Sequence, residues 1–106
     1  MNFDRSKRLF EEGQKNLVGA VNSPVRAYKS VGGTPLFIKK AKGSKIIDVD
    51  NNQYIDLVLS YGPMILGHRP KKIEKSIVKA LKNGYTFGAT SAGEIELAKI
   101  ICDAFP

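Results

Sequence analysis

Three short apolar segments follow one another in the middle of the chain, and tight turns separate them. The segments cover residues 36–41, 45–49 and 53–58 and are rich in Ile, Val, Leu, Phe and Tyr. Lys42-Gly43-Ser44 separates the first two, and Asp50-Asn51-Asn52 separates the second from the third. Asp and Asn favour turns because their side chains bond to nearby backbone and tolerate left-handed angles. This pattern predicts a three-stranded antiparallel meander.

Two later segments carry apolar residues at helical spacing instead. In residues 70–82 the apolar positions recur every three or four residues on one face, with lysines opposite, and Pro70 suits the first turn of a helix. A second helix is predicted from about residue 93 to residue 104. Its expected apolar stripe consists of Leu97, Ala98, Ile101, Cys102 and Phe105.

The N-terminal third predicts less regular structure. Residues 4–12 are compatible with a short helix that Asp4 caps and Gly13 ends. Residues 18–34 contain Gly19, Pro24, Gly32 and Gly33 and are expected to form a long irregular loop. The fold class is therefore α+β: a short helix, a long loop, a three-stranded antiparallel meander and two amphipathic helices. Three short strands cannot cover both apolar stripes, which indicates that further structure covers them in a larger molecule.

Composition narrows the class of protein. The chain has 106 residues, a formal net charge of +7 and 42% hydrophobic residues, which is typical of one small globular domain. No apolar run approaches the roughly 18 residues of a membrane helix, so no membrane association is expected. The lysines lack interleaved aromatic residues, so a solvated surface is favoured over a nucleic-acid site. The single cysteine, Cys102, excludes an internal disulfide and a cysteine-based metal cage, and a reducing, cytoplasmic location is expected.

Most candidate chemistry has a structural explanation. His68 is the only histidine, has no partner at metal-ligand spacing, and is expected to form a structural hydrogen bond. A triad of Ser60, His68 and Asp56 can be written down, but nothing in the spacing supports it. No phosphate-loop motif is present. The remaining carboxylate pair, Asp48 and Asp50, flanks a tight turn and is assigned to that turn.

Two loops are more informative. In residues 22–26, Pro24 stiffens a loop that carries Ser23 and Arg26, which are residue types that bind carboxylates or phosphates. Near residue 61, a Gly/Pro loop presents the ring of Tyr61, either as the wall of a site or as an anchor in the core. Neither loop identifies a ligand by spacing alone.

The same segments resemble a known family. Val21-Asn22-Ser23-Pro24-Val25-Arg26-Ala27, Ser30 to Ile38, and Gly62-Pro63-Met64-Ile65-Leu66-Gly67-His68 are similar to the N-terminal part of the glutamate-1-semialdehyde 2,1-aminomutases. Asp48-Val49-Asp50 with Tyr54-Ile55-Asp56 is a pattern shared by class-III aminotransferases in general. The resemblance runs from about residue 10 to residue 106. It implies the N-terminal segment of a fold-type I transferase that depends on pyridoxal 5′-phosphate, with residues 1–69 forming the part with the meander and residues 70–106 leading into a large domain.

The resemblance also implies an activity. The family converts glutamate-1-semialdehyde to 5-aminolevulinate, the tetrapyrrole precursor, with pyridoxal 5′-phosphate and its amine form, and its members are expected to be homodimers. Arg26 matches the family arginine that holds the substrate carboxylate, Ser23 lies beside it, and Tyr61 stands where a tryptophan usually lines the site. The family's catalytic lysine and its cofactor-binding residues match nothing in residues 1–106. The chain alone is therefore expected to be inactive, with no catalytic, cofactor-binding or metal-binding residue of its own.

Departures from the family pattern leave alternatives open. Only Arg69 stands between His68 and Pro70, where the family usually has two residues, and Thr90-Ser91 replaces the usual Pro-Thr. The chain is an inactive enzyme fragment, part of a complete aminomutase, or a small basic binding module that kept this part of the fold. Salt-sensitive binding to nucleic acid would favour the last of these.

Overall fold

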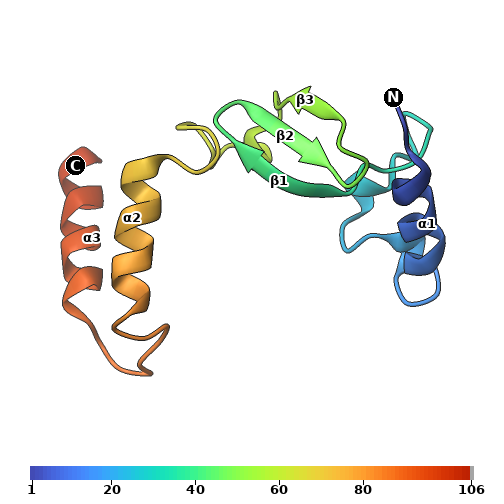
Figure 1. Cartoon of the computed structure of the whole chain (residues 1–106). Helices are drawn as coiled ribbons and strands as arrows, with labels where there is room; N and C mark the ends of the chain where they lie inside the picture. Colours follow the sequence, from blue (N-terminus) through green and yellow to red (C-terminus); the bar gives the residue numbers. More distant parts are fainter. Residues whose placement is uncertain (106) are drawn as a thin grey trace. The chain divides into compact units, whose positions relative to one another are not determined.

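The computed structural model describes residues 1–105, which form two compact units, residues 1–71 and residues 72–105 (Figure 1). The first unit contains helix α1 (Asp4–Gly13), three short 3-10 turns, and a sheet of strands β1 (Ile38–Lys42), β2 (Lys45–Asp48) and β3 (Gln53–Ile55). Helix α2 (Lys71–Leu81) begins at the boundary, and helix α3 (Ala92–Ala104) follows it. The helix and strand content confirms the predicted α+β class. None of the helices in residues 1–105 is both long enough and apolar enough to span a bilayer.

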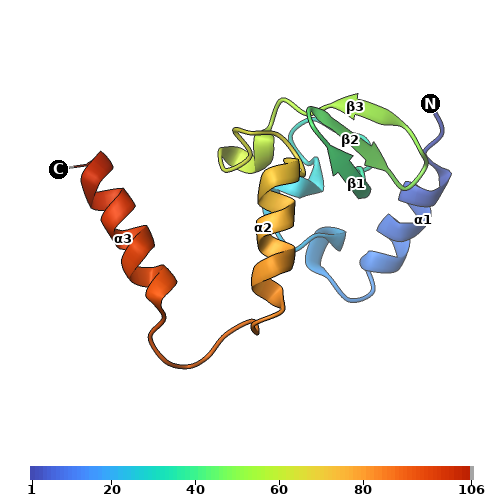
Figure 2. The same cartoon turned by 60° about the vertical axis from the view of Figure 1, so that its left-hand side comes forward.

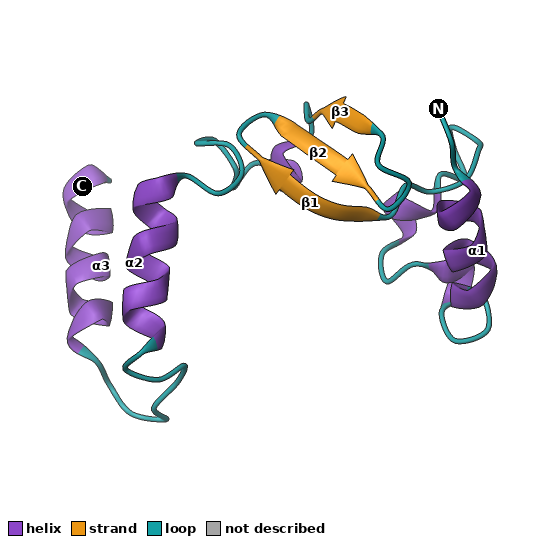
Figure 3. Cartoon of the chain, viewed as in Figure 1, coloured by secondary structure: helices purple, strands orange, loops and turns teal. Residues whose placement is uncertain are grey.

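The sheet is the predicted meander. Its strand order is β1-β2-β3 and both pairings are antiparallel, as the strand arrows in Figure 3 show. The register changes between Ile38 and Lys40, which marks a bulge in β1. The strands are shorter than the apolar pattern suggested, since β3 ends at Ile55 rather than residue 58. The Asp56 carboxylate accepts hydrogen bonds from the backbone N–H groups of Val58 and Leu59, so the chain turns where the strand was expected to continue.

Helix α1 confirms the predicted helix but not its predicted cap. Asp4 does not cap it; the residue before the helix is Phe3, and no side chain of that residue caps the helix. Instead the carboxylate of Asp50 accepts hydrogen bonds from the N–H groups of Arg5 and Ser6, at 2.7 and 2.9 Å. A carboxylate at this end satisfies N–H groups that lack partners within the helix. Asn2 adds a local partner, since its Oδ1 accepts the N–H of Asp4 at 2.8 Å, but the bonds to Arg5 and Ser6 are tertiary, from a residue 44 positions beyond Ser6.

The loop between α1 and β1 holds two 3-10 turns, Val18–Ala20 and Pro24–Ala27, within otherwise irregular backbone (Figure 3). Gly13 is the last residue of α1, and a methyl group added there would lie 3.1 Å from the Cβ of Ala20. Gly13 therefore allows close approach between the helix and this loop. Ala20 is also the most deeply buried hydrophobic residue of the described chain, at 4% exposure.

Residues 72–105 contain most of α2, a loop at residues 82–91, and α3 (Figure 2). Ser91 precedes α3, and the side chain of Glu94 accepts a hydrogen bond from the backbone N–H of Ser91 at 3.0 Å. This is the glutamate half of a capping box, a signal present in the sequence as Ser91-Ala92-Gly93-Glu94 but not used in the prediction.

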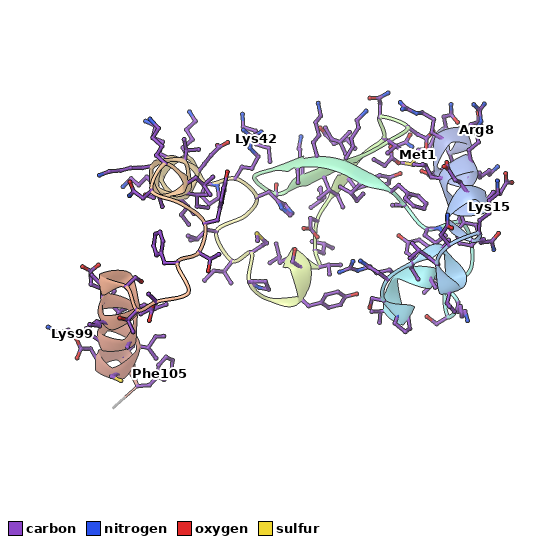
Figure 4. The ribbon with its side chains drawn as sticks, turned by 90° about the horizontal axis from the view of Figure 1, so that it is seen from below. Met1, Arg8, Lys15, Lys42, Lys99 and Phe105 are labelled. Atoms are coloured by element: carbon purple, nitrogen blue, oxygen red, sulfur yellow. The ribbon has the colours of Figure 1, made fainter. Side chains whose placement is uncertain are left out.

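The apolar surface of α3 is wider than the single stripe that was predicted. Ile95 and Ile100 lie outside that stripe at 100° per residue, and they are 75% and 66% exposed. Side chains project from α3 on all sides (Figure 4). A helix that is apolar around most of its circumference is typical of one that other structure surrounds.

Candidate functional site

The loop at residues 22–27 places a charged donor next to an apolar cavity. Ser23 is extended, and Pro24 opens the 3-10 turn Pro24–Ala27, in which the backbone N–H of Arg26 donates to the carbonyl of Ser23 at 3.0 Å. The fixed φ of proline suits the first position of such a turn. Arg26 is thereby held at a defined point of the loop.

The guanidinium of Arg26 is itself oriented. Its Nη1 donates a hydrogen bond to Oδ1 of Asn22 at 2.9 Å, and this is its one side-chain partner among residues 1–105. A guanidinium has five N–H donors, so one bond to Asn22 fixes the group and leaves donors for a bidentate contact. Asn22 was not singled out by sequence reasoning; its spacing of four residues from Arg26 was the available signal.

A cavity of about 360 Å³ lies beside this loop. Apart from Arg26 and Asn22, its lining is formed by aliphatic, aromatic and proline residues from the loop and from the approach to β1. These are Leu17, Ala20, Val21, Pro35, Leu36, Phe37 and Ile38. Arg26 is thus the single charged side chain in a mostly apolar lining, and it is itself exposed and so accessible to a ligand.

The structure does not bring all three predicted site residues to this cavity. Ser23 is half-buried and Tyr61 is 71% exposed, and neither lines the Arg26 cavity. Tyr61 lies in a second segment, residues 57–67, whose conformation is unusual. Leu59, Ser60 and Tyr61 have φ angles of 51°, 53° and 64°, the left-handed region, at about 1–2 kcal/mol per residue.

The segment around Tyr61 is held at both ends. Oδ1 of Asp56 accepts from the N–H groups of Val58 and Leu59, at 2.9 and 3.1 Å, and Oδ2 faces Nε2 of His68 at 2.7 Å. An ionised carboxylate only accepts hydrogen bonds, so Nε2 of His68 is the donor. The hydrogen bond from His68, followed by those from Val58 and Leu59, lowers the pKa of Asp56 from its ordinary value. The structural hydrogen bond expected for His68 is therefore present.

This pair contains two members of the triad that spacing did not support. Within residues 1–105 no hydrogen bond joins Ser60 to His68. His68 also forms an antiparallel bridge with Gly43, with two backbone hydrogen bonds of 2.8 Å. The arrangement joins a loop to a hairpin turn and has no activated nucleophile.

The two carboxylates assigned to the β2–β3 turn have separate partners. Asp48 is fully buried, and its carboxylate accepts hydrogen bonds from the hydroxyl of Tyr54 and from the backbone and side-chain amides of Asn52, each at 2.8 Å. Burial raises the pKa of Asp48, but these hydrogen bonds outweigh burial and leave it lowered. Burial, together with the bond to Asp48, raises the pKa of Tyr54 to about 12. Asp50 stays in the turn, but its carboxylate caps α1, a long-range role that local spacing cannot reveal.

The described residues do not fit the pyridoxal cofactor implied by the resemblance. Such a site needs an amine positioned in a pocket and a phosphate cradle. Every lysine among residues 1–105 is exposed. Lys7 reaches the edge of a cavity of about 460 Å³ whose other lining includes Tyr28, Gly32 and Tyr54, without a second cation. The Arg26 cavity has no lysine.

Comparison with known proteins places the chain in a class. Residues 27–106 match the sequence model of the aminotransferase class-III family. The chain belongs to the class-III aminotransferases. A solved structure with a TM-score of 0.88 and 28% identity, a β-phenylalanine aminotransferase from Variovorax paradoxus, covers 96% of this chain, and the chain covers 23% of it.

Two individual relatives show which class-III aminotransferases the chain resembles in sequence. The chain is 57% identical over all 106 residues to glutamate-1-semialdehyde 2,1-aminomutase from Persephonella marina, and 54% identical over the same length to the protein of that name from Thermodesulfovibrio yellowstonii. It spans about a quarter of the length of each of these relatives, their N-terminal part. The resemblance inferred from the sequence motifs is confirmed.

Proposed function

We propose that this chain is the N-terminal part of a glutamate-1-semialdehyde 2,1-aminomutase, an enzyme of tetrapyrrole biosynthesis, and that it binds the carboxylate of the substrate. The observation that carries the proposal is the Arg26 guanidinium, oriented by Asn22 at the edge of an apolar cavity of about 360 Å³. A planar guanidinium matches the two oxygens of a carboxylate, and an apolar surrounding strengthens the pair. Identity of 57% over all 106 residues of this chain, which is 25% of the length of that relative, supports the choice of substrate.

In this proposal Arg26 binds the carboxylate, while Ser23 and Tyr61 contact the rest of the substrate from two loops. Pyridoxal 5′-phosphate supplies the amino-group transfer in the whole enzyme, and residues outside positions 1–105 hold it. The chain alone is then inactive. The whole enzyme is proposed to be a cytoplasmic homodimer, in which other parts of the protein cover the exposed apolar residues of α2 and α3.

The test uses residues 1–106 joined to the remaining three-quarters of the Persephonella marina enzyme. Arg26→Ala removes both the charge and the fork, and a desolvated pair of this kind is worth about 2–5 kcal/mol. We expect kcat/KM for glutamate-1-semialdehyde to fall by at least ~30-fold, at about 1.4 kcal/mol per factor of ten. Cofactor absorbance should be unchanged. Arg26→Lys should recover only part of the activity, because it keeps the charge and loses the planar fork.

Arg8→Ala is the matched control, since Arg8 is an exposed arginine of α1 that does not line the cavity. It should leave kcat/KM within about twofold, in keeping with the small effects of surface substitutions. Normal turnover by Arg26→Ala would refute the carboxylate assignment. Loss of cofactor binding in Arg26→Ala would instead make Arg26 a cofactor-side or structural residue.

A second candidate function rests on a different cavity. Lys40, Lys42, Lys45 and Arg69 line a hollow of about 320 Å³ on the sheet, and Lys42 lies directly opposite Lys45 across β1 and β2. Like charges in direct opposition are unfavourable unless an anion lies between them. A basic binding module would use this hollow, and its binding to RNA or DNA would weaken steeply with added salt. Binding that is absent at low salt would exclude this alternative.

A further inference from the structure

The carboxylate of Asp56 connects the two ends of the segment that carries Tyr61. One oxygen accepts the N–H groups of Val58 and Leu59, and the other binds His68, which is 12 positions further along. Its side chain is 7% exposed and that of His68 is 17% exposed, so water competes little for the pair. One side chain therefore closes residues 57–67 into a loop.

Both ends of this loop are fixed to the same hairpin turn. The backbone N–H of Asp56 donates to the carbonyl of Ser44 at 2.8 Å, and His68 pairs with Gly43 through two backbone hydrogen bonds. At Gly67 an added methyl group would lie 2.9 Å from the carbonyl oxygen of Gly43, so the approach permits only glycine. The β1–β2 turn is thus a rigid base for the Asp56–His68 pair.

The residues inside the loop need such a restraint. Leu59, Ser60 and Tyr61 are consecutive non-glycine residues with positive φ, and Gly62 follows at 124°. Backbone of this kind persists only where the surroundings impose it, and it collects at binding sites. The left-handed turn starts at Leu59, and the N–H groups of Leu59 and of Val58 before it donate hydrogen bonds to the carboxylate of Asp56.

We infer that Asp56, braced by His68, is a positioning residue that sets the left-handed backbone at residues 59–61 and thereby the placement of the Tyr61 ring at the substrate. The second half of this statement rests on the proposed function. Asp56 does not touch the substrate in this view. It acts through the backbone of the segment and through Tyr61.

The first experiment measures the backbone without using activity. In the chimaera described above, amide hydrogen exchange is followed by mass spectrometry in peptides covering residues 57–67 and residues 38–50. Asp56→Ala should accelerate exchange in residues 57–67 at least about tenfold and leave residues 38–50 unchanged. Asp56→Asn keeps an oxygen acceptor for Val58 and Leu59, so its exchange rate in residues 57–67 should lie between those of the wild type and Asp56→Ala. Unchanged exchange in residues 57–67 would overturn the inference, even if the enzyme proved inactive.

The second experiment is a double-mutant cycle with Tyr61. Asp56→Ala and Tyr61→Ala should each raise KM for glutamate-1-semialdehyde at least about fivefold, and the double variant should be no worse than Tyr61→Ala, because the two act as one unit. Additive effects of Asp56 and Tyr61 on KM would overturn the inference. A Tyr61→Ala variant with normal KM would contradict the proposed role of Tyr61 and leave the backbone experiment to decide the role of Asp56.

Asp50→Ala is the matched control. Asp50 also accepts two backbone N–H groups and a side-chain donor, Ser6, but it caps α1 rather than the Tyr61 segment. Its effect on KM should be independent of Tyr61, and exchange in residues 57–67 should stay at the wild-type rate. Equal coupling of Asp50 and Asp56 to Tyr61 would show general loosening of the fold and overturn the specific role of Asp56.

Discussion

Carboxylates that reach across the sequence organise residues 1–71, whereas residues 72–105 depend on local helical signals. In the first region Asp50 caps a helix 44 positions away, Asp56 binds His68, 12 positions away, and Asp48 is buried with three hydrogen bonds to nearer residues. In the second region Ser76 bonds to Lys72 within α2, and Ser91 bonds to Glu94 at the start of α3. The apolar residues of α2 and α3 are 43% exposed or more at Ile73, Ile77, Ile95 and Ile100.

The two regions are therefore stabilised by different interactions. Polar networks stabilise the first region, because its apolar core is very small. Among residues 1–105, Ala20 is the one hydrophobic residue in the buried class. The second region has apolar side chains with little of the chain to bury them, and helices gain most of their stability from packing. The first region therefore has interactions that single substitutions can remove, and the second has surface that needs a covering partner.

The largest expected difference between the two regions appears when residues 72–105 are isolated. As a synthetic peptide in water, this segment should lose nearly all its helix, because α2 and α3 have only 11 and 13 residues. Isolated helices shorter than about 12–15 residues are marginal in water. Far-UV circular dichroism over a range of peptide concentrations checks this. Strong helix content that does not depend on concentration would show that local signals are sufficient here.

The next effect concerns the buried carboxylate of the first region. In the chimaera, Asp48→Ala removes the acceptor of Tyr54 and Asn52, and hydrogen bonds to a charged group contribute about 1.5–3 kcal/mol. We expect the free energy of unfolding to fall by about 3 kcal/mol in urea titrations. Asp103→Ala, at an exposed acid of α3, should change it by less than about 0.5 kcal/mol. Similar losses from both substitutions would remove the contrast between the regions.

The smallest effect is a pH dependence specific to Tyr54. The pKa of Tyr54 is raised from 10.0 to about 12, so the folded protein holds this proton more tightly than the unfolded chain does. Its contribution to stability is therefore complete below pH 10.0 and is lost as the pH rises towards 12. Tyr54→Phe should cost about 1 kcal/mol at neutral pH and abolish this loss.

Ultraviolet titration of the tyrosines measures the pKa of Tyr54, and urea unfolding at several pH values measures the loss of stability. Tyr85→Phe is the control, since Tyr85 is 87% exposed in the second region. An ordinary titration of Tyr54 would mean that the Asp48–Tyr54 bond does not form in solution.

Local features of the sequence determined the elements and their order. Short apolar segments separated by turn residues at positions 42–44 and 50–52 sufficed for the meander, and helical spacing sufficed for α2 and α3, because these signals act between near neighbours. The family motifs directed attention to Arg26, whereas the stiff Ser23-Pro24 loop by itself only made an anion site one of the open alternatives. Both depend only on which residues are adjacent.

Tertiary structure decided the partners of the polar groups. The sequence predicts Asp4 as the cap and places Asp50 in a turn, but the folded chain brings the carboxylate of Asp50 to the start of α1. Asp56 and His68 are both hydrogen-bonded to the β1–β2 turn, and β3 ends where the carboxylate of Asp56 accepts hydrogen bonds from Val58 and Leu59. A hydrogen bond requires two groups within about 3 Å, and a one-dimensional pattern contains no information about which distant residues the fold brings that close.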